Sequence, residues 1–94
     1  FLAVASWLQL KIYYELQEFS LLDAHLKSVG TFLGRKEKMS YHQHNYYNIV
    51  RMTKGLLALP PNDNKAAEQL RKRMQKTEPL TERDWLLMKL NEIY

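Results

Sequence analysis

Apolar residues recur every three or four positions along most of the chain, the spacing of one face of an α-helix. The first such stripe contains Leu8, Ile12, Leu16 and Phe19. It predicts a helix from about Leu2 to Phe19. The second stripe contains Leu22, Leu26, Val29 and Leu33. It predicts a helix from about Leu21 to Leu33.

The connection between these two helices is predicted to be a very short turn at Ser20. The hydroxyl of Ser20 can accept a hydrogen bond from a free backbone N–H at the start of the second helix, and Asp23 can act as its capping-box partner. With so little linker, the two helices are expected to lie antiparallel and to share their apolar stripes.

Three more helices are predicted after this hairpin. The third spans Tyr41 to Leu57, and Ser40 with Gln43 has the spacing of a capping box. After the Pro60-Pro61 break, the fourth spans Lys65 to Thr77. We expect Asp63 or Asn64 to cap this helix, and Glu68 to pair with Lys72 four residues later.

The fifth helix is predicted to begin at a third capping signature, Thr81 with Asp84, and to pack as a terminal lid. No segment shows the alternation expected of a strand. The prediction is therefore an all-α fold of about five helices, made of antiparallel helical hairpins with a C-terminal capping helix. We expect residues 1–94 to form a single helical domain.

The first hairpin resembles one unit of a tetratricopeptide-like (TPR-like) α-solenoid. The resemblance rests on the apolar ladder Tyr13, Leu16, Phe19, Leu22, Leu26 and Val29. It is similar to a divergent unit, because Gln17 stands where the family favours glycine and Leu22 where it favours alanine. The resemblance implies a helical repeat with a binding or scaffolding role and no reaction.

The first predicted helix is apolar around most of its circumference, as expected for a helix covered on two sides. One interpretation is that the chain is a C-terminal fragment of a longer helical-repeat protein. Phe1, Val4, Trp7 and Leu8 would then pack against neighbouring repeats on the N-terminal side, or against a second copy by self-association. The alternative is that they fill the core of this domain. The apolar run is too short to span a membrane, so no membrane partner is expected.

Composition excludes several classes of site. There is no cysteine, so disulfides, iron–sulfur clusters and thiolate zinc sites are ruled out. This composition is compatible with a cytoplasmic location, which is the compartment we expect. His42 and His44 lie two residues apart, so a helix would point them in different directions, and His25 stands alone. No nucleophile, base and oxyanion donor occur in a recognisable pattern. We therefore expect no catalytic residue, no metal and no cofactor, and hence no enzyme.

The net charge of +4 conceals an uneven distribution. From Arg35 to Lys76 basic residues exceed acidic residues by roughly seven, and the remaining sequence is mildly acidic. The charged connector Arg35–Lys38 and the group Arg71, Lys72 and Arg73 lie in the basic part. Such a patch is either a solvated face or a contact surface for an acidic partner or for nucleic acid. The absence of glycines and aromatic residues beside the second group argues against nucleic acid.

These patterns give two functional hypotheses. The first is a non-enzymatic protein–protein interaction or scaffolding module, an end unit of a helical-repeat protein whose partner is unknown. The alternative is a small basic domain that binds nucleic acid through helices three and four. The candidate partner-binding residues are Tyr41, Tyr46, Tyr47, Arg51, Arg71, Lys72 and Arg73.

Overall fold

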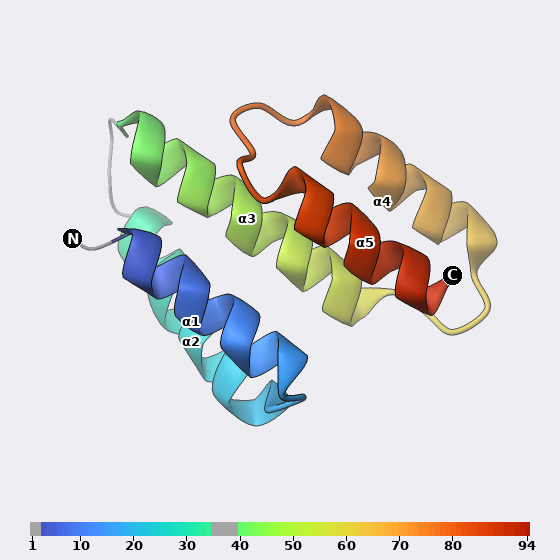
Figure 1. Ribbon diagram of the computed structural model, residues 1–94, viewed down its shortest axis with the longest axis horizontal. Coiled ribbons are helices and arrows are strands. Elements are labelled where there is room, and N and C mark those ends of the chain that lie inside the picture. The colour runs from blue at the N-terminus through green and yellow to red at the C-terminus, as the bar shows by residue number, and fades with distance from the viewer. Residues whose placement is uncertain (1–2, 35–39) are drawn as a thin grey trace. The chain divides into compact units, whose positions relative to one another are not determined.

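The computed structural model describes residues 3–34 and 40–94, and the side chains of residues 7–29 and 40–94. This described part contains five α-helices and no strand (Figure 1). The helices are α1 (Ala3–Glu15), α2 (Phe19–Gly34), α3 (Tyr41–Ala58), α4 (Asn64–Lys76) and α5 (Arg83–Ile93). The all-α prediction is confirmed. The connector Arg35–Lys38, Phe1 and the side chain of Val4 lie outside the described residues.

The chain divides into two compact units, Phe1–Tyr47 and Asn48–Tyr94. The first unit contains α1, α2 and the beginning of α3, and the second contains the rest of α3 together with α4 and α5. In the first unit α1 packs against α2, and in the second α4 packs against α5. The boundary falls within α3, so the Pro60-Pro61 break, which is the clearest interruption in the sequence, lies inside the second unit.

The turn of the first hairpin is built by backbone hydrogen bonds around Gln17. The Glu18 N–H donates to the Tyr13 carbonyl (2.9 Å) and the Gln17 N–H donates to the Tyr14 carbonyl (3.1 Å). Gln17 has a φ of 58°, in the left-handed region. Together these features form a Schellman motif, which ends a helix by satisfying its last carbonyls.

This turn corrects the predicted boundaries of the first two helices. Helix α1 ends at Glu15 and α2 begins at Phe19, so Ser20 lies inside α2 and is not its N-cap. The left-handed residue stops α1 four residues before the predicted end. The sequence pattern concealed this stop because left-handed positions are usually glycine, whereas glutamine adopts that conformation only at a cost.

The first unit buries a different stripe of α1 from the one predicted. Leu10, Leu22, Leu26 and Tyr46 are fully or almost fully buried. Leu8, Ile12, Leu16 and Phe19, the predicted stripe, are instead exposed. Leu10 lies about 160° around the helix from Ile12, given about 100° per residue. Periodicity alone could not decide between the two faces, because both are apolar.

Local capping signals correctly predicted two helix starts. The Ser40 N–H donates to Gln43 Oε1 (2.9 Å) and the Gln43 N–H donates to Ser40 Oγ (3.3 Å), which confirms the capping box of α3. The Ala66 N–H donates to Asp63 Oδ1 (2.9 Å), which confirms Asp63 as the cap of α4.

The third capping prediction was wrong. The N-cap position of α5 is Glu82, which makes no side-chain capping hydrogen bond, so Thr81 does not stand at the predicted N-cap position. The nearby Arg83 side chain instead binds the end of α4. Its guanidinium donates to the Met74 carbonyl (3.0 Å), the Thr77 carbonyl (2.6 Å) and Glu78 Oε1 (2.8 Å). These bonds satisfy carbonyls that a helix end leaves without partners.

The second unit has a core made by α3, α4 and α5. Its buried apolar residues are Ile49, Val50, Met52, Leu56, Ala67, Leu70, Met74, Leu80, Trp85, Leu86 and Leu90. The Leu70 side chain of α4 packs over Gly55 of α3, where an added Cβ would stand 2.9 Å from Leu70 Cδ1. The Asn48 side-chain amide donates to the Pro79 carbonyl (2.8 Å) and so fixes the loop before α5 to α3.

Candidate functional site

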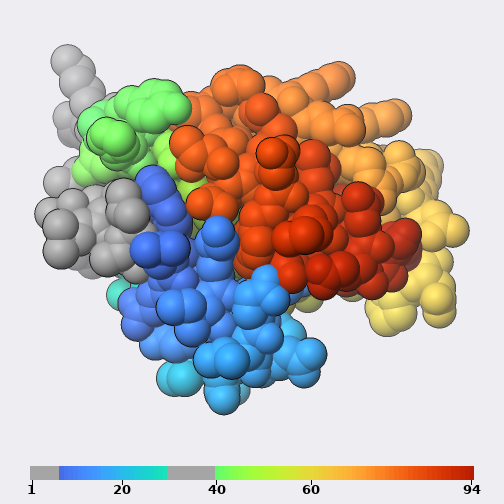
Figure 2. All heavy atoms as spheres, in the orientation of Figure 1, coloured from blue at the N-terminus to red at the C-terminus, as the bar shows by residue number. Residues whose placement is uncertain are grey.

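Among the described side chains of the first unit, a row of exposed apolar residues lies along α1 and the residue that follows it. Leu8, Ile12 and Leu16 are 47%, 54% and 66% exposed, and we call these three residues the α1 apolar face. They are four residues apart, so their side chains form one row along the helix. Figure 2 shows the α1 segment, in blue, at the surface. The row ends at Leu16, the residue after α1, and Phe19 and Leu21 at the start of α2 are also about half exposed.

An aromatic cluster lies on the buried side of this hairpin. Tyr46 of α3 is 0% exposed, and its hydroxyl is 2.9 Å from His25 Nε2 of α2. The Trp7 ring meets the Tyr46 ring edge-on with centroids 6.4 Å apart, and Tyr13 meets His25 in the same way at 6.1 Å. The cluster joins the three helices of the first unit. Sequence reasoning missed it because its partners are far apart in the chain and carry no spacing signal.

This cluster corrects one of the predicted partner-binding residues. Tyr46 was expected on a binding surface, but it is buried and its hydroxyl is hydrogen-bonded, so it stabilises the core. Tyr47 is half-buried, whereas Tyr41 is 61% exposed and its ring contacts that of His42. Arg51 is exposed on α3. Of the three tyrosines, only Tyr41 therefore presents most of its ring to solvent.

The remaining predicted residues lie on α4. Arg71 is half-buried, and its guanidinium binds both Glu68 and Asn91 Oδ1 (2.9 Å to the latter). The predicted Glu68–Lys72 pair is therefore replaced by a Glu68–Arg71 pair. Lys72 and Arg73 are exposed. Arg71 thus holds α4 against α5, while its two neighbours point toward solvent.

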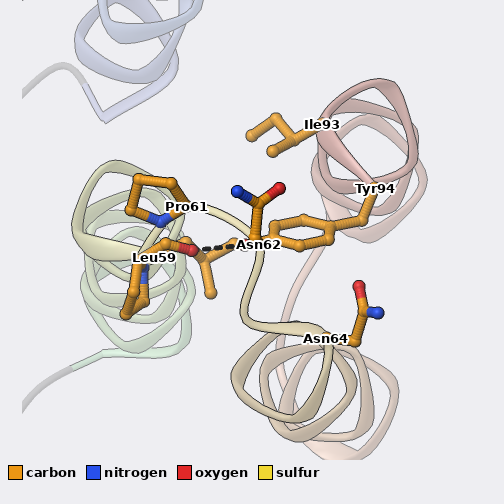
Figure 3. Close-up of a pocket in the computed structure, with 7 residues that line it drawn as sticks. Leu59, Pro61, Asn62, Asn64, Ile93 and Tyr94 are labelled. Carbon is orange, nitrogen blue, oxygen red and sulfur yellow. Dashed lines mark hydrogen bonds between the residues drawn. The ribbon is translucent and has the colours of Figure 1, made fainter.

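A shallow hollow of about 480 Å³ lies in the second unit between the α3–α4 loop and the end of α5 (Figure 3). It is lined by residues 59–62 and by Asn64, Ile93 and Tyr94. The Tyr94 hydroxyl donates to the Pro60 carbonyl and accepts from the Asp63 N–H (3.1 Å). Its lining side chains are apolar or carry an amide or the Tyr94 hydroxyl, and none is a carboxylate, a histidine or a lysine.

Within residues 3–34 and 40–94, no group of three histidine, cysteine, aspartate or glutamate side chains is placed to hold a metal ion. Among the described helices, none combines the length and the apolar character needed to cross a bilayer.

Comparison of the chain with protein-family models, with curated proteins and with solved structures found no match. The TPR-like resemblance of the first hairpin therefore stays a prediction.

Proposed function

We propose that this chain is a non-enzymatic helical interaction module that binds another helix through the α1 apolar face. The observation that supports the proposal is the exposure of Leu8, Ile12 and Leu16 in one row. Scattered exposed apolar residues are ordinary, but a contiguous row of large side chains is typical of a protein-binding surface. A row with anchors one helical turn apart suits recognition of an amphipathic helix.

A second copy of the same chain has the shape to cover this face. Side chains four residues apart form the ridge that packs into the grooves of another helix in the commonest class of helix packing. Two α1 helices carry the same ridge, so a two-fold symmetric contact would bring matching surfaces together.

The charges beside the face also suit an antiparallel pair. Lys11 and Glu15 lie on the same flank of the row, four residues apart. Two helices crossing in opposite directions near Ile12 would place Lys11 of each copy opposite Glu15 of the other. Such rim charges would set the orientation of the pair more than its affinity.

The area of the face limits the affinity of this contact. Three side chains about half exposed present roughly 300 Å² of apolar surface, less than the roughly 800 Å² per partner of a standard interface. Because association also loses translational and rotational freedom, we expect a dissociation constant in the micromolar range or weaker.

Sedimentation velocity over a range of concentrations tests the proposal. The wild-type chain should shift from monomer toward dimer as its concentration rises, and Ile12→Glu should remain monomeric because it places a charge in the contact. Met88→Glu is the matched control, since Met88 is 51% exposed on α5 in the other unit. It should associate as the wild type does.

The orientation of the pair has its own test. Glu15→Lys should weaken association by setting lysines against each other, and adding Lys11→Glu should restore it. A wild-type chain that stays monomeric at its highest soluble concentration would refute the proposal. Equal loss of association in Ile12→Glu and Met88→Glu would also refute it, because the contact would then not depend on the α1 apolar face.

A further inference from the structure

The exposed side of α4 is a row of positive charges. Lys65, Lys72, Arg73 and Lys76 are all exposed, and we call them the α4 basic stripe. At about 100° per residue, Lys65, Lys72 and Lys76 lie within about 40° of one another, with Arg73 beside them. They face away from Ala67, Leu70 and Met74, the buried residues of α4. Figure 2 shows long side chains of the α4 segment, in orange, projecting outward.

These four charges are not neutralised within the described part of the protein. None of the side chains of Lys65, Lys72, Arg73 and Lys76 makes an ion pair or a hydrogen bond with another described residue. The only carboxylate of α4, Glu68, is bound by Arg71 on the flank of the helix. The pairing that the sequence suggested would have neutralised Lys72. The structure instead uses Glu68 elsewhere and leaves the whole stripe cationic.

We propose that the α4 basic stripe binds the phosphate backbone of a nucleic-acid duplex without reading its sequence. The stripe is about 16 Å long, from the helical rise of about 1.5 Å per residue, and can contact several phosphates along one strand. We expect no preference for a particular sequence, because phosphate contacts position a protein on a duplex and do not distinguish one base from another.

The chemistry of the stripe favours a nucleic-acid duplex over a protein surface or a single strand. Protein interfaces place apolar and aromatic residues at their centre and are depleted in lysine, whereas the stripe contains only cations with glutamines beside them. Interfaces with nucleic acid are polar and strongly positive. Single strands are usually held by stacking on aromatic rings, and α4 contains no aromatic residue.

Binding of the 94-residue protein to a labelled 24-base-pair DNA duplex of arbitrary sequence, measured by fluorescence anisotropy at several salt concentrations, tests this inference. Four phosphate contacts predict a slope of about −3.6 for log affinity against log salt, a loss of roughly 100-fold between 50 and 200 mM. Duplexes of different sequence should bind equally well.

The key variant is Lys72→Glu, and Lys27→Glu is its matched control. Each lysine is exposed and lies four residues after a carboxylate, Glu68 or Asp23, and both changes lower the net charge by two. Lys27→Glu also breaks the exposed ion pair with Asp23 (2.9 Å), which adds at most a small loss of stability. Lys72→Glu should weaken binding at least ten-fold at 100 mM salt and flatten the salt slope by one or two. Lys27→Glu should stay within about two-fold of wild type. Circular dichroism would confirm that both variants remain helical.

Several outcomes would overturn the inference. These are absence of duplex binding at 50 mM salt, a flat salt dependence, or equal weakening by the two lysine variants. Tighter binding to polyglutamate would indicate an acidic protein segment, and tighter binding to single-stranded DNA or to vesicles with phosphatidylserine would indicate those polyanions instead. The result is independent of the α1 apolar face, because Ile12→Glu should bind the duplex as the wild type does apart from its lower net charge.

Discussion

Replacing Gln17 with glycine should stabilise the first unit. Gln17 ends α1 with a φ of 58°, a conformation that costs an ordinary residue about 1–2 kcal/mol and glycine almost nothing. Glycine loses about 0.5–1 kcal/mol more backbone entropy on folding, which offsets part of the gain. The Gln17 side chain is exposed, so its removal should create no cavity. The net expectation for Gln17→Gly is a gain of about 0.5–1 kcal/mol in the free energy of unfolding.

Urea unfolding followed by tryptophan fluorescence can measure this gain in the first unit alone. Trp7 lies in the first unit and Trp85 in the second, so a Trp85→Phe background leaves one reporter against Tyr46. The midpoint of unfolding should rise in Gln17→Gly while the slope with urea stays constant. In thermal unfolding, the same gain corresponds to an increase of about 2–8 °C for a domain of this size.

Two further glycine variants show whether the gain comes from backbone conformation. Asn62→Gly should gain less, because Asn62 has a φ of 60° but asparagine tolerates that region better. Gln75→Gly, inside α4, should lose about 1 kcal/mol because glycine destabilises a helix interior. If Gln17→Gly loses as much as Gln75→Gly, Gln17 is helical, the first helix continues through the turn, and the reasoning is refuted.

Two other changes test contacts within each unit. Asp63→Ala should lower the free energy of unfolding by about 1 kcal/mol because it removes the cap of α4, whereas Asn64→Ala should change it by less than about 0.5 kcal/mol; equal effects in urea unfolding would exclude Asp63 as the cap. Tyr46→Phe should cost about 1 kcal/mol because it removes the hydroxyl that bonds to His25, and the exposed Tyr41→Phe should be nearly neutral; a neutral Tyr46→Phe would show that the bond does not stabilise the fold.

Local signals predicted more of this fold than long-range ones. The caps at Ser40 and Asp63 were predictable because a side chain and a backbone N–H three residues away decide them. The end of α1 was not predictable, because it depends on a glutamine in the left-handed conformation. Neither helix propensity nor the spacing of apolar residues indicates that conformation.

The candidate surfaces divide in the same way. Periodicity found the row Leu8, Ile12 and Leu16 but assigned it to the core, because only the packing of α2 decides which side of an apolar helix is covered. The sequence correctly located the basic part of the chain. It could not show which cation of α4 pairs with Glu68, because that depends on the conformations of the side chains. Arg71 forms an ion pair with Glu68 and a hydrogen bond with Asn91, so Glu68 does not pair with Lys72.

The Tyr94 hydroxyl connects two helix ends that are distant in the sequence. It donates to the Pro60 carbonyl and accepts from the backbone N–H of Asp63, the residue whose side chain begins α4. Fraying of the final turn of α5 would therefore release the first turn of α4 as well. In Tyr94→Phe, amide hydrogen exchange at Ala66 and at residue 94 should therefore accelerate together, with little change in the middle of either helix.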